Sequence, residues 1–306
     1  MNIKYVMCLA VFMALASCMP DRRPSDLNKT SNMREGQAAP APAGPADTPT
    51  PAVSKAAAAQ SRTLEKIADR MHVRLAKTQD AKKALELAGE VLDLYKKAID
   101  LNDTDDRLVH KYTRMIELKY NLIIPDGENI DERRKVYASA LELLERLHPG
   151  ENNSIYARFD MALLLILNNE YYIIFQSIGA VNRTREICEK IYSEDKTFED
   201  YSAATVLGRL HFLAPNIPFI MGWPDKNKSR QYLEEAFAAN PGSLLIKFFL
   251  ADTLYALNEK DKALGYFHDV MEAEPRHDIN YFQDKKIQHN CGIRMKELGY
   301  NKINNY

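Results

Sequence analysis

Glycine is scarce in this sequence, and sustained alternation of β-branched with polar residues is missing. Only 12 of the 306 residues are glycine, whereas alanine, leucine, lysine and glutamate are abundant. These four residue types favour helices, and a β-sheet would need alternating segments separated by turn residues. The composition therefore argues against a β-rich body and predicts an all-α protein.

An excess of charge of one sign is also missing. The chain has 41 Lys and Arg against 42 Asp and Glu, which gives a formal net charge of -1. Proteins that bind nucleic acids normally show a concentrated basic face, so the balance argues against that class while leaving room for a local patch. With 46% apolar and 27% charged residues, the composition is that of a globular protein.

Motifs of catalysis and of metal binding are absent as well. The seven histidines are scattered and none has the H-E-x-x-H spacing of zinc proteases. There is no glycine-rich phosphate loop and no G-x-S-x-G elbow. His277 and Asp278, which follow Pro275, fit a solvated turn better than a metal site. We therefore expect no enzyme activity, no cofactor and no metal.

The chain has only four cysteines, and the first two lie in its opening segment. That segment has a positive start at Lys4, a short apolar run, and the tetrapeptide Leu-Ala-Ser-Cys ending at Cys18. The run is too short to span a bilayer, and the tetrapeptide resembles the lipobox of bacterial lipoproteins. We expect residues 1–18 to be a lipoprotein signal peptide, with Cys18 lipidated; the alternative is a plain secretory signal.

The predicted anchor also implies a location. Met19, rather than aspartate, follows the lipidated cysteine. By resemblance to the enterobacterial sorting rule, this favours the outer membrane over the inner one, with the protein facing the periplasm. The other two cysteines, Cys188 and Cys291, could pair in such an oxidising compartment, but sequence alone cannot place them within bonding distance, so pairing stays open.

Two further segments follow the signal peptide. Residues 19–58 are rich in proline, alanine and small polar residues, which cannot bury enough apolar surface to offset chain entropy. We expect a disordered tether there that holds the protein away from the lipid surface. Residues 59–306 form the helical domain.

The stretch 243–275 is the most informative part of that domain. It contains two amphipathic segments joined by a charged turn. The small residues Ala251 and Ala263, the bulky Phe267 and the closing Pro275 follow the tetratricopeptide pattern, in which small residues allow two helices to cross closely. The alternative is an ordinary helical hairpin.

Apolar periodicity predicts further helices along the chain, and together they should form one stack of antiparallel helix hairpins, a tetratricopeptide-like α-solenoid with capping helices. They are expected at 60–77, 80–101, 106–122, 131–147, 161–179, 182–193 and 281–298.

The spacing of the repeat ends is uneven. Asp103, Pro149, Lys196, Pro241 and Pro275 are separated by 46, 47, 45 and 34 positions. Only the last spacing equals the tetratricopeptide period. The run 161–179 is very apolar, but polar residues interrupt it, so we interpret it as one central helix and not as a membrane span.

The C-terminal half resembles a narrower group, the T-component (TatT) lipoproteins associated with TRAP transporters. The resemblance covers roughly residues 153–298 and agrees with the lipobox. It implies an all-helical periplasmic lipoprotein that cooperates with an extracytoplasmic substrate-binding protein and handles a small organic acid or another apolar ligand. The matching positions are Leu207, Gly208, Arg209, Phe212, Pro215, Ala236, Pro241, Leu250, Ala251, Ala263 and Pro275.

The loop 214–224 concentrates large apolar side chains between prolines, including Phe219, Trp223 (the only tryptophan) and Met221. An apolar loop of this kind usually covers something or is itself covered. Two readings remain open: the loop closes the core, or it forms a lid or a docking surface.

The first helices of tetratricopeptide pairs line the concave face, and two of them supply a mixed aromatic and charged groove. Its residues by register are Ser202, Thr205, Arg209, Phe212, Leu245, Phe248, Asp252 and Tyr255. Such a groove could hold an extended peptide or an anionic small molecule, with Arg209 as the charge partner. Alternatively, Arg209 pairs with Asp200 or Asp252. Together with the loop, the candidate binding residues are Arg209, Phe212, Phe219, Trp223, Phe248, Asp252 and Tyr255.

These observations support two functional hypotheses. The first is a non-enzymatic lipoprotein that binds a protein partner or a small ligand, as an accessory of TRAP-type solute uptake. The second is an envelope-assembly scaffold with no small-molecule cavity. An enclosed apolar channel lined by Phe212, Trp223 and Tyr255 would favour the first, and an open, solvated groove would favour the second.

Overall fold

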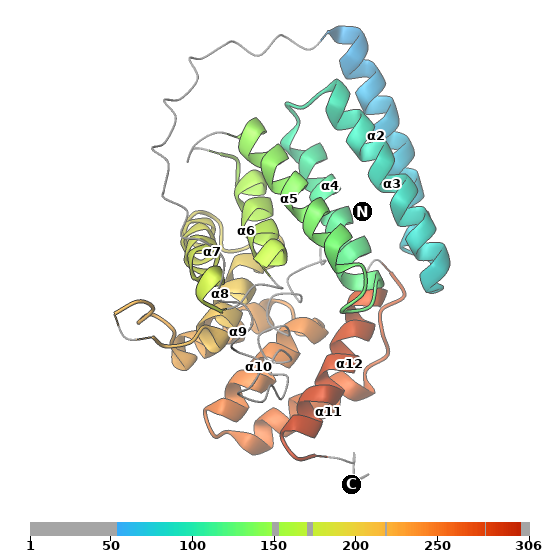
Figure 1. Cartoon of the computed structure of the whole chain (residues 1–306). Helices are drawn as coiled ribbons and strands as arrows, with labels where there is room; N and C mark the ends of the chain where they lie inside the picture. The colour runs from blue at the N-terminus through green and yellow to red at the C-terminus, as the bar shows by residue number, and fades with distance from the viewer. Residues whose placement is uncertain (1–53, 149–152, 170–173, 218, 279, 301–306) are drawn as a thin grey trace, which may run out of the picture.

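The computed structural model describes residues 54–148, 153–169, 174–217, 219–278 and 280–300. Within these ranges every regular element is helical, which confirms the predicted all-α class (Figure 1). The elements are α2 (Lys55–Leu75), α3 (Ala81–Leu101), α4 (Asp106–Glu117), the π-helix η2 (Leu118–Ile123), α5 (Ile130–Leu147), α6 (Ile155–Asn169), α7 (Ile174–Glu194), α8 (Ser202–Leu213), α9 (Lys226–Ala239), α10 (Leu244–Ala256), α11 (Lys260–Glu272) and α12 (Tyr281–Glu297).

Helix starts are fixed by short polar side chains at the positions where the sequence breaks. Asp80, Asp105, Asp225 and Ser243 each accept a hydrogen bond from a backbone N–H of the first turn that follows, in α3, α4, α9 and α10 respectively. These N–H groups have no partner within the helix, so a capping oxygen stabilises the start. The caps explain why the helix boundaries agree closely with the periodicity.

Consecutive helices pair and stack. α2 packs on α3, α6 on α7, α8 on α9, and α10 on α11. The second helix of one pair then packs on the first helix of the next, as α7 does on α8 and α9 on α10. First helices also touch one another, because α4 contacts α6, and α10 contacts both α8 and α12. The predicted stack of antiparallel hairpins is therefore confirmed.

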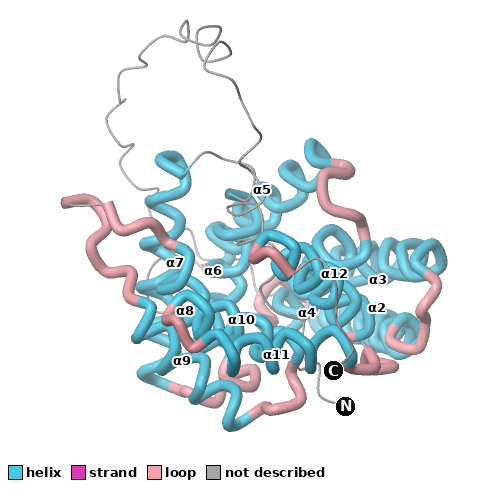
Figure 2. The backbone as a smooth tube through the Cα atoms, turned by 90° about the horizontal axis from the view of Figure 1, so that it is seen from below, coloured by secondary structure: helices cyan, strands magenta, loops and turns pink. Residues whose placement is uncertain are grey.

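The stack curves until its last helix meets its N-terminal half. α12 packs against η2 and reaches the loop that follows it (Figures 1 and 2). The Lys286 ammonium on α12 donates to the Asn121 backbone oxygen at 2.8 Å and lies 2.6 Å from a carboxylate oxygen of Asp126. This contact joins residues some 160 positions apart and closes the inner side of the curve.

Two predicted elements are wrong. The run 161–179 is not a single helix, because α6 ends at Asn169 and α7 begins at Ile174, and the helix predicted at 182–193 is the later part of α7. The Asn169 side chain donates to the Leu165 backbone oxygen at 2.7 Å, at the end of α6. An asparagine that bonds to the backbone favours helix ends over helix interiors, so the polar interruption in this run coincides with the end of α6. Among the described helices, none is both long enough and apolar enough to cross a bilayer.

The predicted signal peptide, Cys18 and almost all of the predicted tether lie outside the described residues. α2 begins at Lys55, so positions 55–58, assigned to the end of the tether, are helical. Cys188 and Cys291 are described, and both are buried free thiols.

Close helix crossings depend on small residues, as the tetratricopeptide pattern requires. Ala251 and Ala263 are completely buried in α10 and α11, with Phe267 beside them. At the crossing of α8 and α9, a Cβ atom on Gly208 would lie 2.5 Å from Leu233 Cγ and 3.2 Å from the Ser229 backbone oxygen. Gly208 is therefore required by contact with α9.

We predict that Gly208→Ala lowers the free energy of unfolding by about 1–3 kcal/mol, because the added methyl group overpacks the crossing. The matched control is Gly265→Ala on α11, where nothing lies within 4 Å of the added Cβ. That change should stabilise the protein by about 0.5–1 kcal/mol through helix propensity. Urea unfolding measures both; equal effects from the two substitutions would contradict the assigned crossing.

Candidate ligand and partner site

Three successive first helices are tied together by one buried carboxylate. Asp252 on α10 accepts from Arg209 of α8 at 2.8 Å on one oxygen and from Arg294 of α12 at 2.6 Å on the other. Only 2% of Asp252 and 4% of Arg209 are exposed. Of the two partners considered for Arg209 from the sequence, the structure gives it Asp252.

The surroundings of Arg209 are mainly aromatic. Its guanidinium carbon lies 4.4 Å from the centre of the Phe249 ring, 5.0 Å from that of Phe212 and 5.8 Å from that of Phe248. Desolvation lowers the pKa of Arg209, and the carboxylate of Asp252 opposes that shift. Arginine stays protonated in proteins, so a cation held by aromatic faces and one carboxylate lies on the inner side of the stack.

The predicted inner-face residues are largely covered. Phe248 is 2% exposed and Leu245 4% exposed, while Phe212 and Tyr255 are partly buried. Ser202 and Thr205 on α8 are also buried. The predicted residues do come together on one side of α8 and α10, but this side is not an open groove, because the stack closes on itself through α12.

The inner side continues on α4 and η2 as a polar stripe that the sequence reasoning missed. Its residues are His110, Arg114, Glu117 and Asn121, all 6% exposed or less. The His110 ring lies 2.8 Å from Asp160 of α6, and Arg114 pairs with Glu117 at 2.8 Å. The signal was present in the sequence, because their spacing of 4, 3 and 4 positions places them on one helix face.

Chemically, this stripe consists of hydrogen-bonding side chains and one ion pair, Arg114 with Glu117. In the described part of the chain, no three His, Cys, Asp or Glu side chains are grouped so that they could hold a metal ion. Buried pairs of this kind are costly to desolvate, and breaking one destabilises the fold strongly.

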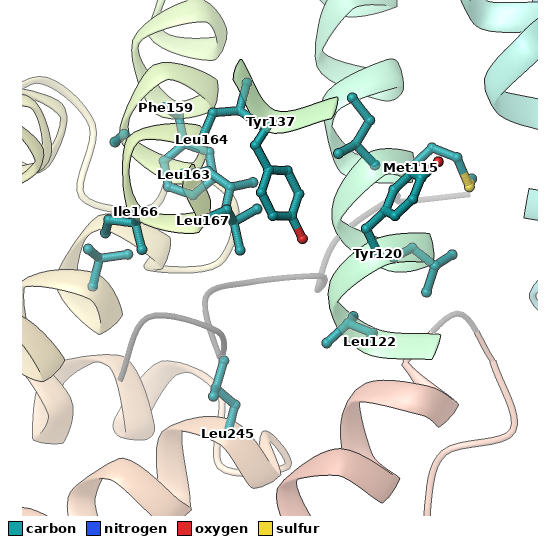
Figure 3. Close-up of a cluster of buried hydrophobic side chains, with 14 of the residues drawn as sticks. Met115, Tyr120, Leu122, Tyr137, Phe159, Leu163, Leu164, Ile166, Leu167 and Leu245 are labelled. Atoms are coloured by element: carbon teal, nitrogen blue, oxygen red, sulfur yellow. The ribbon is translucent and has the colours of Figure 1, made fainter. Parts of the chain in front are cut away.

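Apolar side chains from four elements are buried on the inner side of the stack. Tyr137 of α5 lies beside Leu167 of α6, while Leu122 of η2 and Leu245 of α10 lie farther away (Figure 3). All four are buried. α5 packs directly on α6, and α4, which η2 continues, contacts both.

The polar clefts beside these helices are less suited to a ligand. One, lined by residues that include Asp200, Asn240 and Gln283, has a volume of about 20 Å³, which suits a single water molecule. A second, wide cleft of about 480 Å³ lies at the start of α4, where Asp105 already caps the helix.

The loop between α8 and α9 divides into a packed base and an exposed tip. Met221 is 1% exposed, and the Trp223 indole N–H donates to Asn182 of α7 at 2.8 Å. By contrast, Phe219 and Ile220 are 108% and 56% exposed. Both readings of the loop therefore hold in part, because its base covers the stack while its tip protrudes (Figures 1 and 2).

The base of the loop is further held by ring contacts. The Trp223 ring meets His211 of α8 edge-on at 5.2 Å, and the Arg185 guanidinium lies 4.8 Å from the centre of that indole ring. Burial lowers the pKa of His211 to about 4, with Lys228 and Arg185 acting in the same direction. His211 is thus neutral at pH 7 and packs as an uncharged ring.

We predict that Asp252→Asn lowers the free energy of unfolding by about 3–5 kcal/mol, because it removes the carboxylate that faces the buried Arg209. Arg294→Gln should cost only about 1 kcal/mol, because Arg294 is partly exposed and Asp252 keeps its other partner. Arg230→Gln, which breaks solvated pairs with Glu234 and Glu259, serves as the surface control. Urea titrations rank the three variants, and an Asp252→Asn protein as stable as the surface control would contradict this role.

Comparison with solved structures supports the fold. A thermophilic TPR protein from Thermus thermophilus is similar to the chain with a TM-score of 0.52 and 13% sequence identity, over 77% of this chain and 99% of that one. No protein-family model matches the sequence, and no curated protein matches it either. At this identity the likeness concerns the fold alone, and it supports a TPR-like architecture for the chain.

Proposed function

We propose that the protein is a lipid-anchored, TPR-like binding protein of the bacterial envelope that handles a small ligand in its interior, as an accessory of TRAP-type solute uptake. The observation that carries this proposal is the closure of the stack by α12 on η2. Closure covers the side of the stack that an open solenoid would offer to an extended peptide.

The lining favours a ligand with an apolar body and an anionic end. Tyr137, Leu167 and Leu245 supply apolar surface (Figure 3). Arg209 on α8 and Arg294 on α12 supply two guanidinium groups around the single carboxylate of Asp252 on α10. Small-molecule sites commonly combine a mostly apolar lining with a few fixed polar groups.

The partner follows from the resemblance of the C-terminal half to T-component lipoproteins. We propose an extracytoplasmic substrate-binding protein of a TRAP system as that partner. If the full chain is crosslinked in its native host and purified, it should retain such a protein. Finding cell-wall or secretion proteins in its place would favour the rival function, an envelope-assembly scaffold.

The ligand prediction uses Leu245→Trp, which narrows the interior. Native mass spectrometry of the full chain from its native host should show a bound small molecule, and Leu245→Trp should lower its occupancy at least about tenfold. Leu85→Trp on α3, a partly buried leucine away from this lining, is the matched control and should retain the ligand.

Thermal melting must show that both tryptophan variants are folded. A wild-type protein that carries no ligand, or a folded Leu245→Trp protein with full occupancy, would contradict ligand handling. The anchored location is tested separately.

For the anchor, we predict that Cys18→Ser moves the protein from the membrane pellet to the soluble periplasmic fraction after a high-salt wash. Lipidation requires the cysteine thiol, and a protein without the acyl chains has lost most of its membrane affinity. Fractionation followed by immunoblotting measures this. Retention of Cys18→Ser in the salt-washed pellet would show that Cys18 is not the anchor.

A further inference from the structure

Exposed apolar side chains are concentrated at one point of the molecule. In the part of the chain that the structure describes, three large hydrophobic residues are exposed: Phe219, Ile220 and Ile293. The first two are neighbours at the tip of the loop between α8 and α9, which projects beyond the helices on both sides (Figures 1 and 2). Two adjacent apolar side chains on a protrusion would be stabilised by contact with an apolar surface that covers them.

The tip is held in place by its own backbone. Ile217 and Met221 exchange two backbone hydrogen bonds, of 3.0 and 2.8 Å, across an isolated β-bridge. Phe219 lies between them with a φ of 66°, a left-handed conformation that is uncommon for a bulky residue. Both the backbone and the exposure of Phe219 are thus unfavourable in the isolated protein, and strained positions of this kind cluster at functional sites.

Positive charge follows the loop, at the start of α9. Lys226 and Lys228, in the first turn of α9, are exposed, and neither forms an ion pair with any described residue. The base of the loop is fixed to the stack by Met221 and Trp223, so the tip and the two lysines keep a set relation to the fold.

We propose that Phe219 and Ile220 insert into an anionic phospholipid membrane, with Lys226 and Lys228 contacting its headgroups. A stable protein interface covers about 800 Å² on each partner, far more than two side chains on a narrow tip present. A membrane needs no matching surface, and its affinity grows with buried apolar area and with attraction between basic residues and anionic lipids.

This contact orients the protein on the membrane and is too small to anchor it alone. A lipid anchor at Cys18 would hold the tip at high local concentration near the bilayer, so a weak contact is enough. The inference depends neither on the ligand nor on the TRAP partner, and its test uses protein without the acyl chains.

The experiment is flotation of the chain from residue 18 onward, carrying Cys18→Ser, with vesicles of phosphatidylethanolamine and phosphatidylglycerol. The chain should float with these vesicles and much less with phosphatidylcholine alone. Phe219→Gly with Ile220→Ser should reduce flotation at least about tenfold. Because glycine tolerates the left-handed backbone, this variant should melt at or above the temperature of the parent chain.

Matched variants separate insertion from other effects. Ile293→Ser removes the other exposed isoleucine, on α12, and should float like the parent chain. Lys226→Glu with Lys228→Glu should weaken flotation with anionic vesicles. Phe219→Trp should keep flotation and give a blue-shifted emission when vesicles are added. The proposal is wrong if the parent chain fails to float, or if the Phe219→Gly, Ile220→Ser chain floats equally well.

Discussion

The buried carboxylate of Asp252 is the constraint on which the C-terminal half depends. It binds Arg209 of α8 and Arg294 of α12, so α8, α10 and α12 cannot shift independently. Charges with so little exposure to water are tolerated only when they are paired. The curvature that brings α12 onto η2 is fixed where Asp252 holds these helices together.

Closure changes what a stack of helix hairpins can do. An open solenoid offers its concave face to extended chains. In this protein the same face carries buried ion pairs on α4, α8 and α10, and apolar side chains such as Tyr137 and Leu245 turn inward (Figure 3). Under the proposed function a ligand is held inside, while the outer helices and the loop after α8 remain available for larger partners.

The loop between α8 and α9 shows how one apolar segment serves two purposes. Trp223 and Met221 pack against the stack, where a hydrogen bond to Asn182 and contact with the neutral ring of His211 fix them. Phe219, two positions before Met221, does not take part in that packing, and its side chain is exposed. The base of the loop is thus part of the core, while its tip stays exposed to solvent. Because the base is fixed, the small apolar contact point at the tip can be kept rigid.

Most helix positions and the small residues Gly208, Ala251 and Ala263 at the close crossings could be predicted from the sequence, because periodicity and small side chains act over a few neighbouring positions. The end of α6 inside 161–179 was missed, because the apolar residues on both sides of the polar interruption were taken as one helix. Whether Arg209 would pair with Asp200, Asp252 or a ligand depended on contacts between distant helices. Closure through Lys286 and Asn121 was decided by the tertiary structure alone, because it depends on small rotations that add up over all the repeats, and no local sequence pattern determines their total. The division of the loop into a packed base and an exposed tip was also visible only in the tertiary structure.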